Sequence, residues 1–227
     1  MNVPKPAPKF DRYAREYTTL HDDSVRASGE SSDYFADYKV QCLVRLGAPS
    51  RGPILDYGCG IGLLTARLAP HFAEVHAYDP SGESLEMARA AAPSATIWDD
   101  AASIPDGYFG TAVLACVLHH VPPGQRADLL GTIREKLAPN GRLVIFEHNP
   151  WNPLTRRAVA ACPFDDDAVL LWPGELRKLL REVGFSRVRQ DYVVFFPRAL
   201  AALRPLEPLL RGVFLGAQTM TLGERAP

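Results

Sequence analysis

The sequence is poor in cysteine, and its few cysteines are scattered. Four occur among 227 residues, at positions 42, 59, 116 and 162, and no two of them form a C-x-x-C pair. A disulfide framework and a cysteine-based zinc site are therefore not expected. Isolated cysteines are typical of a reducing compartment, so we expect a cytoplasmic protein.

Long apolar runs and an excess of charge of one sign are also missing. No stretch approaches the ~20 apolar residues of a membrane span, and Met1–Phe10 lacks the apolar centre of a signal peptide. Pro4, Pro6 and Pro8 instead predict a loose tail over residues 1–9. The 25 basic and 26 acidic residues give a net charge of −1. This balance argues against a nucleic-acid partner, because binding phosphates favours a basic surface.

Glycine, by contrast, is concentrated at one point in the chain. Residues 54–57 are typical of a short buried strand, and residues 63–69 are typical of a helix; Gly58, Gly60 and Gly62 lie between them. Glycine lets the backbone bend and approach a ligand, and a helix N-terminus offers free N–H groups. The stretch predicts a nucleotide-cofactor loop. Its third glycine comes one place too early for the G-x-G-x-x-G of dinucleotide enzymes.

Strands and helices alternate along the rest of the chain. The apolar run 111–118 shows no alternation, which predicts a central strand of a parallel sheet. Further strands are predicted at 74–79, 95–98, 142–146, 186–196 and 213–220, and helices at 10–17, 34–46, 81–89, 126–137 and 173–183. The polar residues 21–32 predict a loop or lid.

A leucine-rich stretch at residues 198–212 interrupts this alternation. Pro205 and Pro208 break any long helix, so we expect two short amphipathic helices inserted before the last strand. Capping or packing is the favoured role for the insert. A homodimer face and a weak contact with a membrane surface are the alternatives.

Several motifs occur in the order found in one enzyme family. The D-x-G-x-G-x-G of residues 56–62 resembles the first motif of the class I S-adenosylmethionine-dependent methyltransferases. Residues 10–17 resemble the F-D-x-x-A-x-x-Y segment of this family, and residues 118–122 resemble its L-H-H-V-P motif. The resemblance covers roughly residues 10–196. One departure is Gly110-Thr111, where many members have Phe-Asp.

The resemblance implies an α/β fold of the Rossmann-like methyltransferase type. The expected sheet has seven strands, mostly parallel with the last antiparallel, and helices on both faces. Residues 1–50 are expected to form N-terminal helices or a lid over the site. Residues 51–227 are expected to form the cofactor-binding core, with the helical insert near 198–212.

The resemblance also implies S-adenosylmethionine as methyl donor and S-adenosylhomocysteine as product. Asp79 ends the second predicted strand, where an acid can accept both hydroxyls of an adenosine ribose. Asp100 is the first choice for the adenine amino group and Asp99 the second. The predicted cofactor-binding residues are Tyr13, Tyr17, Asp56, Gly58, Cys59, Gly60, Gly62, Asp79, Pro80, Asp99, Asp100, Ala101 and Cys116.

Histidines near the predicted strand ends are the candidates for a catalytic base, because histidine titrates near neutral pH. His148 is the first choice, since it follows the fifth predicted strand; His120 and His119 come next. A structural histidine bonded to backbone remains the alternative for each. The predicted acceptor-binding residues are His21, Asn149, Trp151 and Asn152. Metal-assisted O-methylation is a further alternative, because His148 and Asp165–Asp167 could gather, but their spacing is not a recognised ligand pattern and no metal site is predicted.

These observations favour an enzyme that methylates a small molecule at oxygen with a histidine base. An RNA or protein methyltransferase of the same fold is the first alternative. A cofactor-binding subunit that no longer transfers methyl groups is the second, because fold alone does not fix function.

Overall fold

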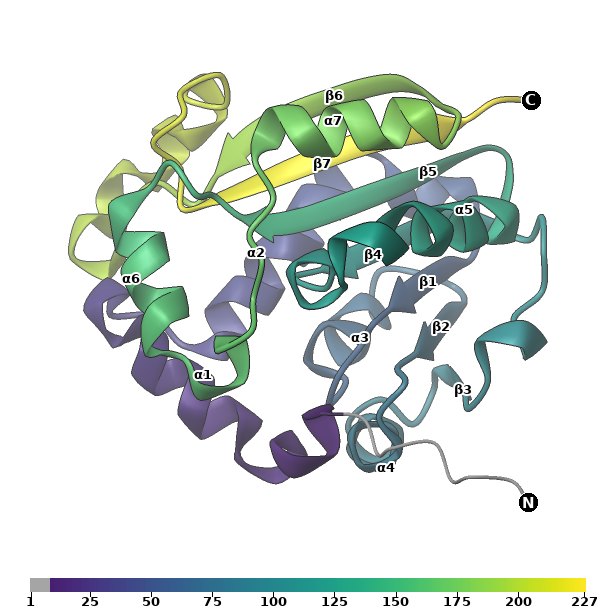
Figure 1. The fold of residues 1–227 in the computed structure, drawn as a ribbon, viewed down its shortest axis with the longest axis horizontal. Helices are drawn as coiled ribbons and strands as arrows, with labels where there is room; N and C mark the ends of the chain where they lie inside the picture. Colours follow the sequence, from purple (N-terminus) through teal and green to yellow (C-terminus); the bar gives the residue numbers. More distant parts are fainter. Residues whose placement is uncertain (1–8) are drawn as a thin grey trace.

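A seven-stranded sheet runs through the molecule in the computed structural model, which describes residues 9–227 (Figure 1). The strand order is β3-β2-β1-β4-β5-β7-β6, and β7 runs antiparallel to both of its neighbours. The expected seven strands with an antiparallel last strand are thus confirmed, whereas the tail predicted for residues 1–9 lies almost entirely outside the described residues. The strands are β1 Ile54–Tyr57, β2 Val75–Tyr78, β3 Thr96–Trp98, β4 Phe109–Ala115, β5 Leu137–His148, β6 Phe185–Val193 and β7 Gln218–Arg225.

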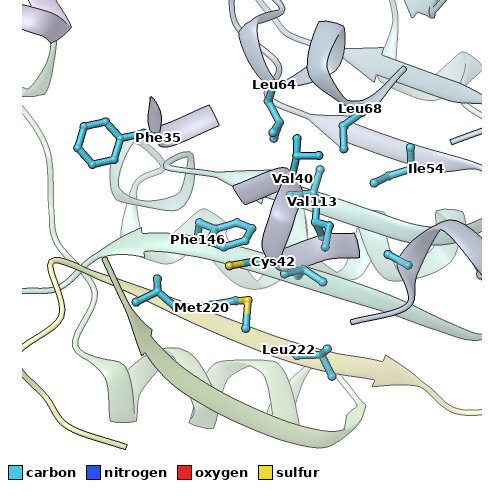
Figure 2. Close-up of a cluster of buried hydrophobic side chains, with 14 of the residues drawn as sticks. Phe35, Val40, Cys42, Ile54, Leu64, Leu68, Val113, Phe146, Met220 and Leu222 are labelled. Atoms are coloured by element: carbon cyan, nitrogen blue, oxygen red, sulfur yellow. The ribbon is translucent and has the colours of Figure 1, made fainter. Parts of the chain in front are cut away.

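Helices cover both faces of the sheet. Val113 and Phe146 of the sheet pack in one buried cluster with Val40 of α2 and Leu64 of α3 (Figure 2). On the opposite face, side chains of α5 and α7 pack in a second cluster with other residues of β4 and β5. The α-helices are α1 Tyr17–Val25, α2 Ser32–Arg45, α3 Leu63–Leu68, α4 Gly82–Ala91, α5 Arg126–Lys136, α6 Pro153–Ala161 and α7 Pro173–Glu182. No helix of residues 9–227 is both long and apolar enough to cross a bilayer.

Several connecting segments lie together at the edge of the sheet where the parallel strands have their C-terminal ends. There, β1 leads into the glycine turn, β4 into the 3-10 helix Leu118–His120, and β5 toward α6. Helices α1 and α6 contact each other and lie together at one end of the sheet (Figure 1). Open α/β sheets bind their ligands at this edge.

The N-terminal segment differs from its predicted form. Two 3-10 turns, Lys9–Arg12 and Ala14–Glu16, replace the single helix predicted at 10–17. The loop predicted at 21–32 is wrong over its first half, where α1 continues to Val25. Its polar side chains bond to one another: the Asp22 carboxylate accepts hydrogen bonds from the Ser32 N–H at 2.7 Å and hydroxyl at 2.6 Å. Polarity here therefore reflects internal hydrogen bonding.

The C-terminal part shows three further differences. The last strand begins at Gln218, five residues later than predicted, and just before it Gly216 passes so close to Val193 that a Cβ would lie 2.7 Å from its carbonyl oxygen. The segment predicted as two helices at 198–212 forms two 3-10 helices within Arg198–Leu209, but the kink between them is at Leu200 and not at the prolines. Helix α6 was not predicted, although Asn152 caps it and Pro153 opens it.

Candidate functional site

A cavity of about 360 Å³ lies beyond the ends of the parallel strands. The glycine turn and Asp79 line one side of it, and four histidines line another: His21, His119, His120 and His148. Side chains from the N-terminal segment and from residues 164–167 complete the wall. Of the predicted site residues, those that line the cavity are Tyr17, His21, Asp56, Gly58, Cys59, Gly60, Asp79, Pro80, Cys116, His119, His120 and His148.

The glycine turn depends on left-handed backbone conformations. Gly58, Gly60 and Gly62 have φ values of +82°, +52° and +82°. A Cβ at Gly58 would lie 2.5 Å from a methyl of Val117, and one at Gly62 would lie 2.8 Å from the Cα of Ala88, whereas a Cβ at Gly60 would meet open space. Gly58 and Gly62 therefore permit close packing, and Gly60 leaves room on the cavity side.

Asp79 fixes the turn to the end of β2. One carboxylate oxygen accepts a hydrogen bond from the Gly60 N–H at 2.8 Å, and the other accepts one from the Ser81 N–H at 2.9 Å. Burial raises the pKa of Asp79, and these two backbone donors partly offset that effect. Because each carboxylate oxygen can accept more than one hydrogen bond, Asp79 keeps acceptor capacity for a ligand in the cavity.

Asp56 and Lys39 bring two opposite charges to the same cavity. One oxygen of Asp56 accepts a hydrogen bond from the Thr65 hydroxyl at 2.7 Å, while the buried Oδ1 has no hydrogen-bond partner among residues 9–227. Burial raises the pKa of Asp56 to about 7. The Lys39 ammonium lies 6.0 Å from the ring centres of Phe35 and Phe146 and also lines the cavity.

The first of the four histidines, His119, is held between two carboxylates. Its Nδ1 lies 2.6 Å from Oε2 of Glu147, and its Nε2 lies 3.6 Å from Oδ1 of Asp165. Burial by itself would lower the pKa of His119, but the charges of Glu147 and Asp165 outweigh burial and raise it to about 9. Burial likewise opposes ionisation of Glu147, yet the charge on His119 dominates and lowers the Glu147 pKa.

The other three histidines have different surroundings. His120 directs Nε2 toward Oδ1 of Asp165 at 3.2 Å and meets the Phe10 ring edge to face. His21 pairs its Nδ1 with the Ser32 hydroxyl at 2.8 Å, and burial lowers its pKa to about 4. His148 lies beside the ring of His119; burial first, and then the charge on His119, lower its pKa to about 3.

Several predicted site residues do not line the cavity. Asp99 pairs with Arg89, and Asp100 caps its own turn by accepting the Ala102 N–H at 3.1 Å. Tyr13 packs against Phe164. The remaining predicted residues outside the lining are Gly62, Ala101, Asn149, Trp151 and Asn152.

Asn149 and Asn152 instead bond to the protein itself. The Asn149 amide donates to the carbonyls of Phe214 and Gly216 at 2.8 and 2.7 Å, and Asn149 is fully buried. Asn152 caps α6, and Trp151 is 55 % exposed, packed edge to face on Trp172. Asn149 and Asn152 follow the end of a strand, which suggested contact with a ligand. In the structure their side chains instead hold the loop after β5 by hydrogen bonds to residues 214–216.

Sequence reasoning missed four side chains of the site. Lys39, on the helix predicted at 34–46, and Phe164 were not singled out from the sequence, although both line the cavity. Glu147 stood out only as the neighbour of His148, and Asp165 only as part of an acidic run. The roles of Glu147 and Asp165 depend on His119, which lies 28 and 46 residues away in the chain, so no local sequence pattern indicates these roles.

A family model for a methyltransferase domain matches residues 33–202 of this chain. The chain belongs to this family. The methyltransferase is 30 % identical over 142 residues to an uncharacterized methyltransferase of Staphylococcus carnosus, and the match covers 61 % of this chain and 65 % of that relative. It thus spans just under two thirds of that relative's length.

Two further comparisons extend over most of the methyltransferase. It is 25 % identical over 228 residues to a protein of Psychrobacter arcticus named ubiquinone biosynthesis O-methyltransferase, with 84 % of each chain covered. A crystal structure of an S-adenosylmethionine-dependent methyltransferase from Archaeoglobus fulgidus superposes with a TM-score of 0.71 at 16 % identity, covering 92 % of this chain and 99 % of that one. The similarity to the Archaeoglobus fulgidus structure shows a shared Rossmann-like fold.

The cofactor of this methyltransferase is S-adenosylmethionine. The residues present fit that molecule: its amino-acid end carries an ammonium and a carboxylate, which complement the unpartnered Oδ1 of Asp56 and the ammonium of Lys39. The open space at Gly60 lets a nucleoside approach the backbone closely. The acceptor capacity of Asp79 suits the ribose hydroxyls of that nucleoside. The bound cofactor supplies an activated methyl group on a sulfonium.

Proposed function

We propose that this methyltransferase methylates an oxygen atom of a small molecule and that His148 acts as the base. One observation carries the proposal: a single cavity has the cofactor turn on one side and four histidines on another. Its volume of about 360 Å³ is at the lower end of the range for small-molecule sites. Methyl transfer needs the acceptor aligned with the methyl carbon and water excluded, which a cavity walled on several sides favours.

The cover of the cavity supports a small acceptor over RNA or protein. Phe10 and Tyr17 of the N-terminal segment line it together with Phe164, and the rings of Tyr17 and Phe164 stack at 4.9 Å. In this proposal the described residues up to 50 serve as the lid over cofactor and acceptor. A strand of RNA or a protein segment needs an open groove instead.

His148 is favoured as the base because, within residues 9–227, it has no hydrogen bond and, unlike His120, no carboxylate partner, and its low pKa keeps the ring neutral and able to accept a proton. Its side chain forms no hydrogen bond within the described part of the chain, whereas His21 bonds to Ser32 and His119 bonds to Glu147. It lines the cavity and follows directly on Glu147 at the end of β5. A base is needed for a hydroxyl acceptor far more than for an amine. The name of the Psychrobacter arcticus relative also supports oxygen as the methylated atom.

The proposal is tested by incubating the full chain with S-adenosylmethionine and a panel of phenols, aliphatic alcohols, carboxylic acids and amines. Products are identified by mass. We expect a mass gain of one methyl group on a hydroxyl compound, and product only from amines, or none from any small molecule, would contradict the proposal.

His148→Gln tests the base separately. We expect turnover of the identified acceptor to fall by about 10²–10⁴-fold, since general base catalysis has that magnitude. Cofactor affinity should stay within a few-fold, measured by calorimetry. His71→Gln is the matched control, because His71 is exposed and outside the cavity. Unchanged turnover in His148→Gln would remove His148 as the base.

A further inference from the structure

Three ligand-type atoms converge at the cavity wall opposite the cofactor turn. Nε2 of His119 and Nε2 of His120 lie 3.6 and 3.2 Å from the same oxygen, Oδ1 of Asp165. All three atoms lie within 4.8 Å of one another. Ligands about 2.0–2.2 Å from one metal ion are separated by about 3.0–3.6 Å in tetrahedral or octahedral geometry. The two distances to Asp165 match a shared cation, and the two imidazole nitrogens lie within 4.8 Å of each other.

Direct hydrogen bonding does not account for this arrangement. Oδ1 of Asp165 is buried and has no hydrogen-bond partner within residues 9–227, although two imidazoles face it. The contact with His119 is too long for a hydrogen bond, and the one with His120 is at ion-pair distance but is not an aligned hydrogen bond. A buried carboxylate oxygen that faces two imidazoles without an aligned hydrogen bond is rare and calls for an explanation such as a bound ion.

Glu147 orients His119 as a metal ligand is oriented. Its Oε2 pairs with Nδ1 of His119 at 2.6 Å, so Nε2 of His119 points away toward Asp165. Its Oε1 accepts hydrogen bonds from the N–H groups of Val117 and Leu118 at 3.2 and 2.8 Å. Histidines that bind metals commonly give their other nitrogen to a carboxylate in this way, which fixes the ring and its tautomer.

Buried polar contacts hold the two ligand-bearing segments together. The His119 carbonyl accepts the Val169 N–H at 2.9 Å. The Arg126 side chain, 2 % exposed, donates to the carbonyls of Leu118 and Val121 and, at 2.6 Å, to that of Val169. The three ligand atoms are therefore positioned in advance by the fold.

We propose that His119, His120 and Asp165 bind one divalent first-row transition-metal ion, with Glu147 orienting His119. Two imidazoles and one carboxylate suit zinc, iron, cobalt or manganese, whereas calcium and magnesium prefer oxygen ligands. All three side chains line the cavity, so the remaining coordination positions face the space for the acceptor. The sequence predicted no metal site. Its local patterns did not reveal this one because Asp165 lies 46 and 45 residues after His119 and His120. The metal site does not depend on the proposed O-methylation.

The experiment uses the full chain after chelator treatment, with Zn²⁺ as the probe in equilibrium dialysis. We expect one bound equivalent per chain. Glu147→Gln should weaken Zn²⁺ binding about 10–100-fold, because that is the usual effect of losing a residue that orients a metal ligand. Asp165→Asn and His120→Gln remove ligands themselves and should each weaken binding more. His21→Gln is the matched control, because His21 lines the same cavity but pairs with Ser32. It should bind Zn²⁺ like the parent protein.

Co²⁺ provides a second readout that does not depend on the variants folding well. Bound at this site in the unaltered protein, it should show visible d–d absorption with nitrogen ligation, abolished by one equivalent of Zn²⁺. No stoichiometric Zn²⁺ binding, or Asp165→Asn binding as tightly as the parent, would overturn the site. Calorimetry with S-adenosylmethionine on the metal-free protein reports the methyltransferase site separately, so the two proposals fail independently.

Discussion

At the scale of single residues, we infer that the charge state of Asp56 controls how tightly the cofactor binds. It is fully buried, and burial raises its pKa to about 7. The neighbouring Asp79 raises this pKa further, whereas Lys39 and the Thr65 hydroxyl lower it. A carboxyl group with such a pKa changes charge within the physiological range.

Cofactor affinity should therefore rise with pH. Asp56 is ionised to about one tenth at pH 6 and about nine tenths at pH 8 if its pKa is about 7. The ionised form attracts the cofactor's ammonium and sulfonium, so we expect the dissociation constant of S-adenosylmethionine to fall about five- to tenfold over this interval. Calorimetry at pH 6, 7 and 8 measures it.

Asp56→Asn is the control for this pH dependence. It keeps the shape of the side chain and removes the ionisable group, so the variant should bind more weakly and lose most of the pH dependence. An unchanged slope in Asp56→Asn would assign the pH dependence to another group.

Residues whose role follows from local backbone chemistry were predictable from the sequence. The glycines at 58, 60 and 62 adopt the left-handed conformations that a tight turn requires. The histidines were found as candidates, but their differences were not predictable. His119 is distinguished from His148 by Glu147 and Asp165, which come from other elements.

At the scale of elements, the loop after β5 is fastened to the segment before β7. The buried Asn149 side chain donates to the carbonyls of Phe214 and Gly216, and its Oδ1 accepts the Trp151 N–H at 3.1 Å. Its backbone N–H adds a bond to Ala217 at 3.0 Å. These contacts set the direction in which the chain leaves His148.

Asn149→Ala should lower stability and leave cofactor binding within a few-fold. The substitution removes the hydrogen bond to the buried Gly216 carbonyl, and a buried carbonyl without its partner costs about 1–3 kcal/mol. Urea unfolding followed by circular dichroism measures the change. A stable Asn149→Ala protein with specifically impaired acceptor turnover would instead support the acceptor-binding role predicted from the sequence.

The bounds of elements with a strong hydrophobic periodicity or with clear glycine and proline signals at their ends were predictable. The bounds of elements that depend on tertiary contacts were not. Helix α2 and the strands β1, β2 and β4 lie within a few residues of their predicted bounds. The start of β7 follows the close approach of Gly216 to Val193, and α1 depends on hydrogen bonds between Asp22 and Ser32. The dimer face and membrane contact considered for 198–212 remain predictions.

At the scale of the whole molecule, the parallel sheet brings distant residues to one edge. The glycine turn follows β1, Asp79 follows β2, the paired histidines follow β4 and His148 ends β5. The N-terminal segment and residues 163–167 then enclose the space between them. We propose that this cavity holds S-adenosylmethionine in contact with Asp79.

Calorimetry with S-adenosylmethionine and S-adenosylhomocysteine tests that claim most directly, on the parent protein, Asp79→Ala and Asp99→Ala. We predict micromolar binding, about −8 kcal/mol, weakened at least about tenfold by Asp79→Ala because a good hydrogen bond to a charged group is worth about 1.5–3 kcal/mol. Asp99→Ala should bind like the parent, since Asp99 pairs with Arg89 outside the cavity. Binding of neither ligand, or binding untouched by Asp79→Ala, would contradict the account.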